Sequence, residues 1–202
     1  MIGILDYGAG NIRSLRNALL KIKQKNFIVK VKKDLDKCSK LIIPGVGSYF
    51  RAITKLKKKK LIHSIKEFAK KKPVLGICLG MQILSKFGFE EKKTNGLNLI
   101  DGKVISLYPH PSERFSHVGW NEIQFKTNSK IFKNIKKSSE FYFLHSFHFV
   151  AKSKKNVSSY AIFKKKIVSS VEKGYIYGVQ FHPEKSHETG LKLLDNFCKI
   201  KC

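Results

Sequence analysis

The sequence has few acidic residues, because 14 Asp and Glu stand against 41 Lys and Arg and leave a formal charge of +27. A chain this basic attracts polyanions without specificity. The excess is nearly all lysine, and its runs at 57–60, 70–72 and 164–166 are scattered and not interleaved with aromatic residues. Arginine, which suits bidentate contacts with phosphates and base edges, is scarce. We therefore expect a lysine-rich solvated surface and no specific nucleic-acid partner.

The sequence also lacks long apolar runs and paired cysteines. No apolar run approaches the roughly 20 residues that span a bilayer, so no membrane partner is expected. The four cysteines, at 38, 78, 198 and 202, show neither the spacing nor the density of a secreted disulfide scaffold, and Asp6 stands where a signal peptide would stay apolar. We expect a cytoplasmic protein. Its 202 residues suffice for one buried core and are too few for two ordinary enzyme domains, so residues 1–202 are predicted to form one domain.

The order of apolar patterns predicts an α/β fold. Short apolar runs alternate with helical spacing at first, then strand-like runs follow one another with little helix, and a last strand and helix close the chain. Alternation of strand and helix implies parallel crossovers. We expect an open, mostly parallel central sheet flanked by helices, with additional antiparallel strands in the middle of the chain. The predicted strands are 2–6, 27–31, 40–43, 74–77, 103–107, 117–125, 140–150, 159–163 and 176–181, and the clearest helical segments are 12–22, 53–68 and 189–199.

One short segment has the features of a nucleophile elbow. An apolar strand pattern ends at Cys78, which is flanked by Gly76 and Gly80 and followed by a helical pattern. A strand-to-helix turn this sharp crowds the backbone, so its flanking positions must be small. Such a turn presents the thiol at a helix N-terminus, where the thiolate is favoured. Considered alone, a cysteine in an apolar run is more often a buried structural residue.

A second segment supplies the base that a cysteine nucleophile needs. The strand pattern 176–181 leads into His182, and Glu184 follows two residues later. A histidine takes the thiol proton, and a carboxylate fixes the tautomer and orientation of that histidine. Cys78, His182 and Pro44 all follow predicted strands, at the edge where open α/β sheets bind ligands. The two segments together predict a catalytic triad of Cys78, His182 and Glu184.

Other motifs that suggest a cofactor or a metal are incomplete. Gly8-Ala9-Gly10 follows a predicted strand, but Arg13 stands where a dinucleotide-binding loop has its third glycine, so we interpret the segment as a tight turn. His145 and His148 are three residues apart on a predicted strand and would point to opposite faces. Cysteines 198 and 202 lack further ligands nearby in the sequence. We expect no cofactor and no metal.

The triad segments resemble those of the class I glutamine amidotransferases, whose triad is Cys-His-Glu. Within that family, the segments 6–15 and 117–121 are similar to the glutaminase subunits of imidazole glycerol phosphate synthases. The resemblance covers most of the chain and implies hydrolysis of L-glutamine to glutamate and ammonia. The segments that carry the triad resemblance are Gly76-Ile77-Cys78-Leu79-Gly80-Met81-Gln82 and His182-Pro183-Glu184.

The resemblance also implies residue roles. Cys78 would attack the glutamine amide, His182 would move the proton, and Glu184 would orient the imidazole. Backbone donors near the nucleophile would stabilise the oxyanion, and two glycines allow one peptide plane there to turn. Many relatives have tyrosine where this chain has Phe147. The implied oxyanion positions are Gly45, Val46, Gly47 and Leu79, and the implied substrate contacts are Gln82, His145, Ser146 and Phe147.

A partner is implied because ammonia is no longer a nucleophile once bulk water protonates it. The resemblance implies a heterodimer with a (β/α)8-barrel cyclase subunit of histidine biosynthesis. Asn11, Trp120, Tyr142 and Lys185 would lie near that partner or the ammonia exit, and a core position is the alternative for Trp120.

Three other functions stay open from the sequence. The closest is a glutaminase that feeds a sugar-modifying synthetase of surface-polysaccharide or flagellin glycan pathways, which the segment 145–149 resembles slightly more. The others are a basic nucleic-acid-binding α/β protein with a vestigial Cys78, and a stand-alone cysteine hydrolase.

Overall fold

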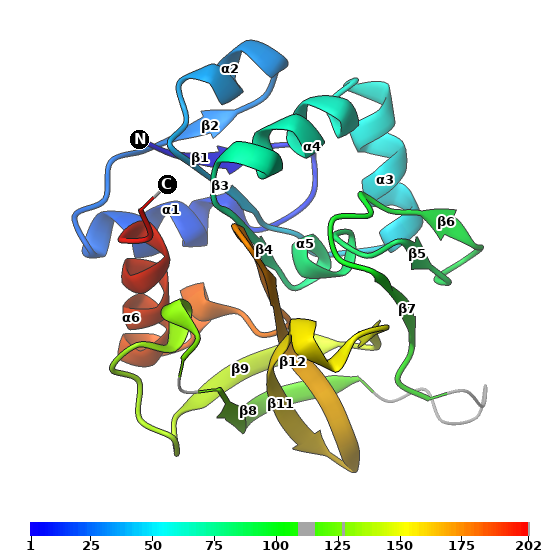
Figure 1. The fold of residues 1–202 in the computed structure, drawn as a ribbon, viewed down its shortest axis with the longest axis vertical. Coiled ribbons are helices and arrows are strands. Elements are labelled where there is room, and N and C mark those ends of the chain that lie inside the picture. The colour runs from blue at the N-terminus through cyan, green and yellow to red at the C-terminus, as the bar shows by residue number, and fades with distance from the viewer. Residues whose placement is uncertain (109–115, 127, 202) are drawn as a thin grey trace.

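A nine-stranded sheet forms the centre of the protein in its computed structural model, which describes residues 1–108, 116–126 and 128–201 (Figure 1). The strand order is β2-β1-β3-β4-β13-β12-β11-β8-β9, and a smaller sheet has the order β10-β7-β5-β6. The strands of the large sheet are β1 (Ile2–Leu5), β2 (Asn26–Val29), β3 (Lys40–Ile43), β4 (Val74–Ile77), β8 (His117–Phe125), β9 (Glu140–His145), β11 (Val157–Phe163), β12 (Lys165–Lys173) and β13 (Ile176–Val179). Those of the smaller sheet are β5 (Phe87–Gly88), β6 (Thr94–Asn95), β7 (Gly102–Ser106) and β10 (Phe147–Ala151).

The large sheet has a parallel half and an antiparallel half. β2, β1, β3, β4 and β13 pair in parallel, whereas β12, β11, β8 and β9 continue the sheet by antiparallel pairing. This arrangement confirms the predicted fold class. The α-helices are α1 (Ile12–Lys21), α2 (Lys32–Asp36), α3 (Tyr49–Lys58), α4 (Ile62–Lys71), α5 (Leu79–Gln82) and α6 (His187–Cys198), and the 3-10 helices are η1 (Lys130–Phe132), η2 (Lys154–Asn156) and η3 (Pro183–Lys185).

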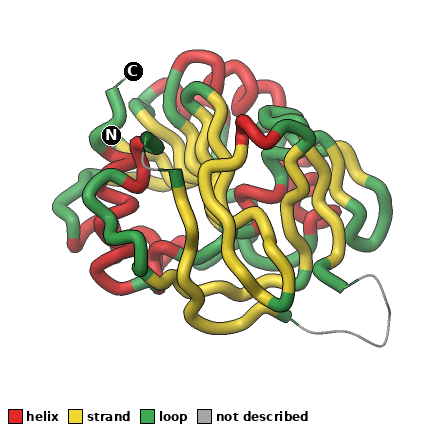
Figure 2. Tube along the Cα trace, turned by 60° about the horizontal axis from the view of Figure 1, so that its bottom comes forward, coloured by secondary structure: helices red, strands yellow, loops and turns green. Residues whose placement is uncertain are grey.

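Helices cover both faces of the parallel half, as Figure 2 shows. Apolar residues of α1 and α6 join one buried cluster, and those of α2, α3 and α4 join another. Successive residues of β3 alternate between the two clusters, since Leu41 and Ile43 belong to one and Ile42 to the other. This two-sided burial explains why the central strands are apolar throughout rather than alternating. No helix among the described residues has the length and apolar character to cross a membrane.

The predicted helical segment 53–68 is two helices, α3 and α4. Lys60 has a φ of +55°, its N–H donates to Lys57 O, and Leu61 N–H donates to Leu56 O. These two bonds form a Schellman motif, which ends α3 and buries Leu61. Lys23 ends α1 in the same way. Because lysine occupies the left-handed position that glycine usually takes, the sequence carried no stop signal.

The predicted strand 140–150 is also divided, between β9 and β10. The chain leaves the large sheet at Ser146, so β9 pairs with β8 whereas β10 pairs with β7 of the smaller sheet. Smaller differences occur elsewhere in the chain. Val31, expected in a strand, is the N-cap of α2, and the β12 strand was not predicted. The break at Ser146 matters most, because it places both sheets beside the carboxyl end of β4.

Candidate active site

Cys78 occupies a strained turn between β4 and α5. Its φ of 53° and ψ of −111° lie in a region that L-residues rarely adopt. Both neighbouring glycines are required by close contacts, because a Cβ on Gly76 would lie 2.5 Å from Gly80 O and one on Gly80 would lie 1.8 Å from Ile43 O. The structure therefore contains the sharp turn that the glycine spacing predicted. The helix that follows is a single turn, so it contributes less dipole than a longer helix would.

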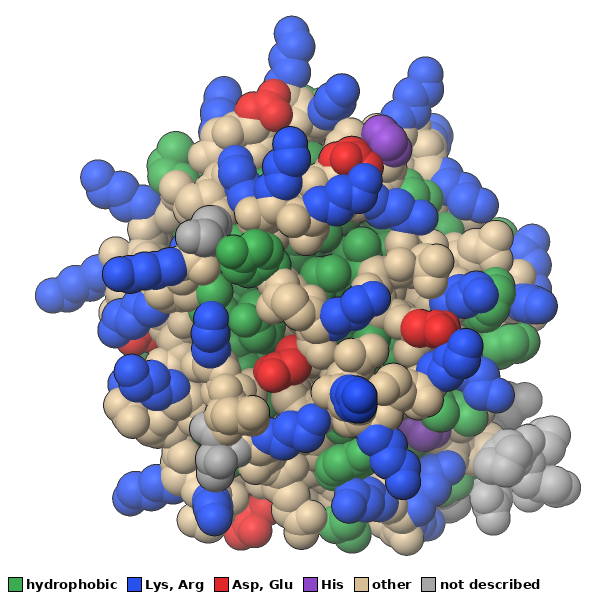
Figure 3. Space-filling view, in the orientation of Figure 1, with side chains coloured by type: hydrophobic (Ala, Val, Ile, Leu, Met, Phe, Trp, Pro, Cys, Tyr) green, Lys and Arg blue, Asp and Glu red, His purple; other side chains and the backbone are tan. Residues whose placement is uncertain are grey.

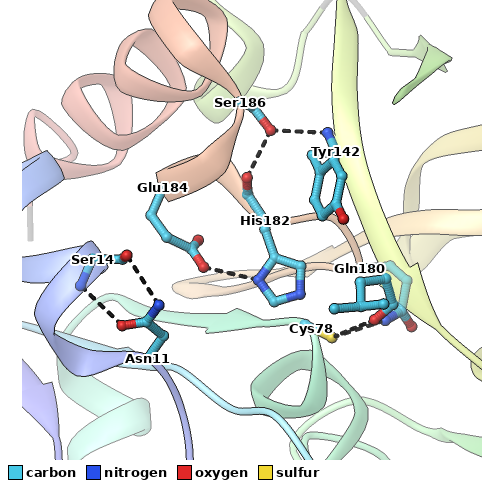
Figure 4. Close-up of polar contacts among 9 residues, drawn as sticks. Asn11, Ser14, Cys78, Tyr142, Gln180, His182, Glu184 and Ser186 are labelled. Atoms are coloured by element: carbon cyan, nitrogen blue, oxygen red, sulfur yellow. Dashed lines mark hydrogen bonds and ion pairs between the residues drawn. The ribbon is translucent and has the colours of Figure 1, made fainter. Parts of the chain in front are cut away.

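The loop after β13 brings His182 and Glu184 to the cysteine. His182 Nδ1 and Glu184 Oε1 are 2.8 Å apart, and the two side chains are 3% and 5% exposed. The backbone of His182 is fixed on both sides, because its N–H donates to Tyr142 O and its carbonyl accepts from Ser186 Oγ. The imidazole lies between Glu184 and Cys78 (Figure 4). The three side chains therefore lie in the spatial order Cys78, His182, Glu184 that the predicted triad requires.

No hydrogen bond closes the contact between Cys78 and His182 in this structure. His182 Nε2 is buried without a partner among the described residues, and Cys78 Sγ lies 3.7 Å from Leu144 O instead. Burial by itself would lower the pKa of His182. Its interactions with Cys78 and Glu184 outweigh burial and raise this pKa to about 10, so the imidazolium is favoured.

The loop after β3 approaches Cys78 from the other side. Tyr7 Oη donates to Pro44 O at 2.9 Å, and burial raises the pKa of this tyrosine. A Cβ on Gly45 would lie 2.6 Å from the Tyr7 hydroxyl and 2.8 Å from Leu79 Cβ. Gly47 has a φ of +107° and open space around it. The start of this loop is therefore tightly packed, whereas Val46 and Gly47 are exposed.

A cavity of about 360 Å³ opens onto Cys78. This volume is in the range of small-molecule sites. Most of the predicted oxyanion and substrate residues line it, although Gly45 does not. Four lining residues were not predicted, namely Ser48, Glu90, Ser116 and Leu144. The lining residues are Val46, Gly47, Ser48, Cys78, Leu79, Gln82, Glu90, Ser116, Leu144, His145, Ser146 and Phe147.

Glu90 is an acidic residue that lines the cavity. Its Oε2 accepts a hydrogen bond from Tyr49 N–H at the start of α3, and burial raises the pKa of its carboxyl group. A partly buried carboxylate at this wall gives the cavity an acceptor for a cationic group. The only sequence signal was an acidic pair after a short apolar run, which is too common to be informative.

The predicted partner residues fall into two groups. Trp120 is exposed, stacks on His187 at a centroid distance of 4.8 Å and contacts the edge of Tyr142 at 5.9 Å. Lys185 Nζ lies 5.3 Å from the centre of the Tyr142 ring. Asn11 makes a different contact and caps α1, because its Oδ1 accepts from Ser14 N–H (Figure 4). A core position for Trp120 is excluded.

The remaining histidine and cysteine candidates are dispersed. His145 and His148 lie on strands of different sheets. Cys38 and Cys198 are free thiols, and position 202 lies outside the described residues. Among the residues that the structure describes, no group of three His, Cys, Asp or Glu side chains is placed to hold a metal ion.

The family is decided by comparison with known proteins. The family model described as "Glutamine amidotransferase class-I" matches residues 3–200. The chain belongs to the class I glutamine amidotransferases. It is 43% identical to imidazole glycerol phosphate synthase subunit HisH 1 of Campylobacter jejuni (strain 81-176), over 99% of this chain and all of that protein. It is 40% identical to subunit HisH 2 of the same synthase from Methanococcus maripaludis, over 98% and 99% of the two chains.

Solved structures share the amidotransferase fold. The structure of PurLQS from Thermotoga maritima has a TM-score of 0.76 at 20% identity and covers 98% of this chain and 96% of that one. A putative GMP synthase subunit from Thermoplasma acidophilum has a TM-score of 0.72 at 17% identity, with 97% and 90% covered. At these identities the similarity concerns the fold alone. The similarity agrees with the predicted fold class, because these structures share the overall fold of this chain.

Proposed function

We propose that this amidotransferase is the glutaminase subunit of an imidazole glycerol phosphate synthase of histidine biosynthesis. The observation that carries the proposal is the order Cys78, His182, Glu184 beside a cavity of suitable size. The two subunits named above, which match this chain over nearly its whole length, favour that synthase. L-glutamine would be hydrolysed here, and the ammonia would pass to a cyclase subunit.

The chemistry follows from the positions of the three side chains. The Cys78 thiolate attacks the side-chain amide carbon of glutamine, and the imidazolium of His182 gives its proton to the departing ammonia. The resulting thioester is hydrolysed by a water molecule that His182 deprotonates, which releases glutamate and restores the thiolate of Cys78 and the imidazolium of His182. Glu184 fixes the proton of His182 on Nδ1 and supports the imidazolium. The raised pKa of His182 suits its part as the acid.

The oxyanion of the tetrahedral intermediate needs backbone donors. We assign one donor to Leu79 N–H, which follows the nucleophile, and a second to the segment 45–47. The free second half of this loop favours a change of peptide orientation at Gly47. We assign Gln82, Ser146 and Glu90 to the wall that holds the amino-acid end of glutamine.

The partner surface is proposed on β8 and β9, beside the nucleophile. Val118, Trp120 and Leu144 are exposed apolar residues, and Val118 is paired with Leu144 and Trp120 with Tyr142. The carbonyl of Leu144 is also the group that contacts the Cys78 thiol, so this surface lies directly over the site where ammonia forms. Exposed aromatic and apolar residues in one patch are typical of a binding surface. Lysine and arginine, by contrast, are spread over the whole visible face (Figure 3).

The test is glutamate release from glutamine by the purified chain, alone and with a (β/α)8-barrel cyclase subunit, beside Cys78→Ala. We expect turnover that rises with the cyclase and disappears in the variant. Turnover that needs Cys78 but ignores the cyclase would overturn the assignment of the synthase and point to a sugar-modifying partner or a free hydrolase. Absence of turnover under all these conditions would contradict the glutaminase assignment.

A further inference from the structure

A buried histidine outside the cavity is hydrogen-bonded on both sides. His117, on β8, is stacked between Phe143 at a centroid distance of 4.4 Å and Phe163 at 4.0 Å. Its Nδ1 lies 3.1 Å from His145 Nε2, and its Nε2 lies 3.3 Å from Asn121 Nδ2. His117 does not line the cavity, although its neighbour His145 does. The mechanism above therefore gives it no part.

The contact between Asn121 and a backbone carbonyl fixes which atom is the donor in each of these hydrogen bonds. Asn121 Nδ2 lies 2.9 Å from Ile162 O, and because a carbonyl only accepts, this atom is the amide nitrogen and can only donate. His117 Nε2 must then accept, so its proton is on Nδ1 and is donated to His145 Nε2. His145 in turn carries its proton on Nδ1 and donates it to Phe147 O at 2.9 Å. Burial lowers the pKa of His117 to about 4 and that of His145 to about 3, which keeps both rings neutral.

The Phe147 carbonyl also accepts a hydrogen bond from a residue near the nucleophile. Gln82 Nε2 donates to Phe147 O at 2.8 Å and to Gln180 Oε1 at 3.2 Å. With its oxygen held by Gln82, the Gln180 amide turns its Nε2 toward Cys78 Sγ, at 3.6 Å. A donor at this position stabilises a thiolate, whereas the reversed amide would place an oxygen against it.

We propose that His117 is a positioning residue for the nucleophile: it fixes His145 on the Phe147 carbonyl, which orients the Gln82 and Gln180 amides so that Gln180 donates to Cys78 Sγ. Because two donors converge on Phe147 O, no proton can pass along this series of hydrogen bonds. The series therefore affects only the orientation of the side chains. The inference concerns the site of the proposed glutaminase, but it predicts a property of the cysteine itself.

A purely structural role for His117 is the competing explanation, because its ring is stacked between two phenylalanines. Two substitutions separate the roles. His117→Phe retains an aromatic ring for stacking and removes the donor to His145. His117→Asn loses the ring but places an amide N–H near the former position of Nδ1. If stacking is what matters, Phe is the milder change; if the hydrogen bond is what matters, Asn is.

The test measures the rate at which iodoacetamide alkylates Cys78 in the full chain, across pH, with the modified peptide identified by mass spectrometry. We expect His117→Phe to slow alkylation at neutral pH about fivefold, the effect of one lost hydrogen bond, and to move the midpoint of the pH profile upward because the thiolate loses its oriented donor. His117→Asn should stay within about twofold of the native rate. Equal effects of the two substitutions, or a native rate in His117→Phe, would overturn the proposal.

Two additions keep the test decisive. If His117→Phe does not fold, as thermal unfolding would show, Asn121→Ala can be used instead, at a half-buried position. This substitution removes the contact that fixes the tautomer of His117 and should slow alkylation by about fourfold. A native alkylation rate in that variant would also contradict the proposal. Because alkylation needs neither glutamine nor a partner, a failed glutaminase assignment would leave this result interpretable.

Discussion

The two sides of the nucleophile differ in how firmly they are held. On one side, His182 and Glu184 are buried, and the backbone of His182 is bonded to Tyr142 and Ser186. On the other side, Val46 is 45% exposed, and the segment 46–48 lies between the cavity at Cys78 and a second cavity of about 610 Å³ beside Gly10. The comparison indicates that the side chains of His182 and Glu184 are fixed by their surroundings, whereas residues 46–48 border open space on both sides.

The largest effect is expected from removal of the base. His182→Ala leaves the thiol without a proton acceptor, and we expect a loss of kcat of about 10⁴-fold with the partner present. Steady-state release of glutamate measures it. A residual rate within tenfold of native would show that His182 is not the catalytic base.

The next effect is on stability at the elbow. Gly80→Ala places a Cβ where Ile43 O lies, so backbone must move, and we expect a loss of about 3 kcal/mol or more in the free energy of unfolding. Gly174→Ala is the matched control, because Gly174 has a φ of +58° but open space around it, and should cost about 1 kcal/mol. Urea denaturation of both variants measures the difference. Equal losses would mean that the close contact at Gly80 relaxes freely.

A smaller effect is expected from Glu184→Gln, which retains the shape of the side chain and removes its charge. The pKa of His182 should fall, because burial then acts against a weaker attraction, and kcat should fall about 10²-fold. Since the raised pKa favours the folded state below pH 6.5 and this contribution disappears as pH rises through about 10, the stability advantage of the native chain should shrink over that interval. Histidine NMR and urea denaturation at several pH values check both statements. An unchanged pKa would contradict them.

The smallest effect is expected from a substitution in the segment 46–48. Gly47→Ala meets no neighbouring atom, but its φ of +107° is unfavourable for alanine, so the loop should shift its conformation at little cost to the fold. We expect kcat for glutamine to change about tenfold while the rate of Cys78 alkylation stays native. A parallel change in both rates would mean that the two sides of the site are coupled more closely than the contacts indicate.

The parts of the site that the sequence predicted are those whose signals are local. Gly76 and Gly80 flank Cys78 because the turn itself requires them, and Glu184 follows His182 because the two side chains bond directly. Glu90 and Tyr7 were missed because they act across the fold, through Tyr49 N–H and Pro44 O, and nothing near them in the sequence records those contacts.

Secondary structure was likewise predicted where the signal is local and missed where it depends on distant contacts. β3 and β4 were predicted with their observed bounds because apolar runs covered on both faces are unambiguous. The break between α3 and α4 was missed because Lys60 stands where a glycine would have signalled the end of the helix. The break at Ser146 depends on which sheet each half of the segment joins, and that choice is made by distant strands.

The parallel pairing of β4 with β13 has a consequence for how the protein matures. Gln180 and Cys78 are 102 positions apart, and His182 follows the strand that completes the centre of the sheet. Contacts between such distant segments form late, since a long loop must close first. During synthesis on the ribosome, Cys78 is added long before His182. The chain therefore lacks the histidine that activates the cysteine until its last strand has been synthesised. Ammonia release is thereby tied to completion of the whole sheet, and fragments that end before β13 would be inactive.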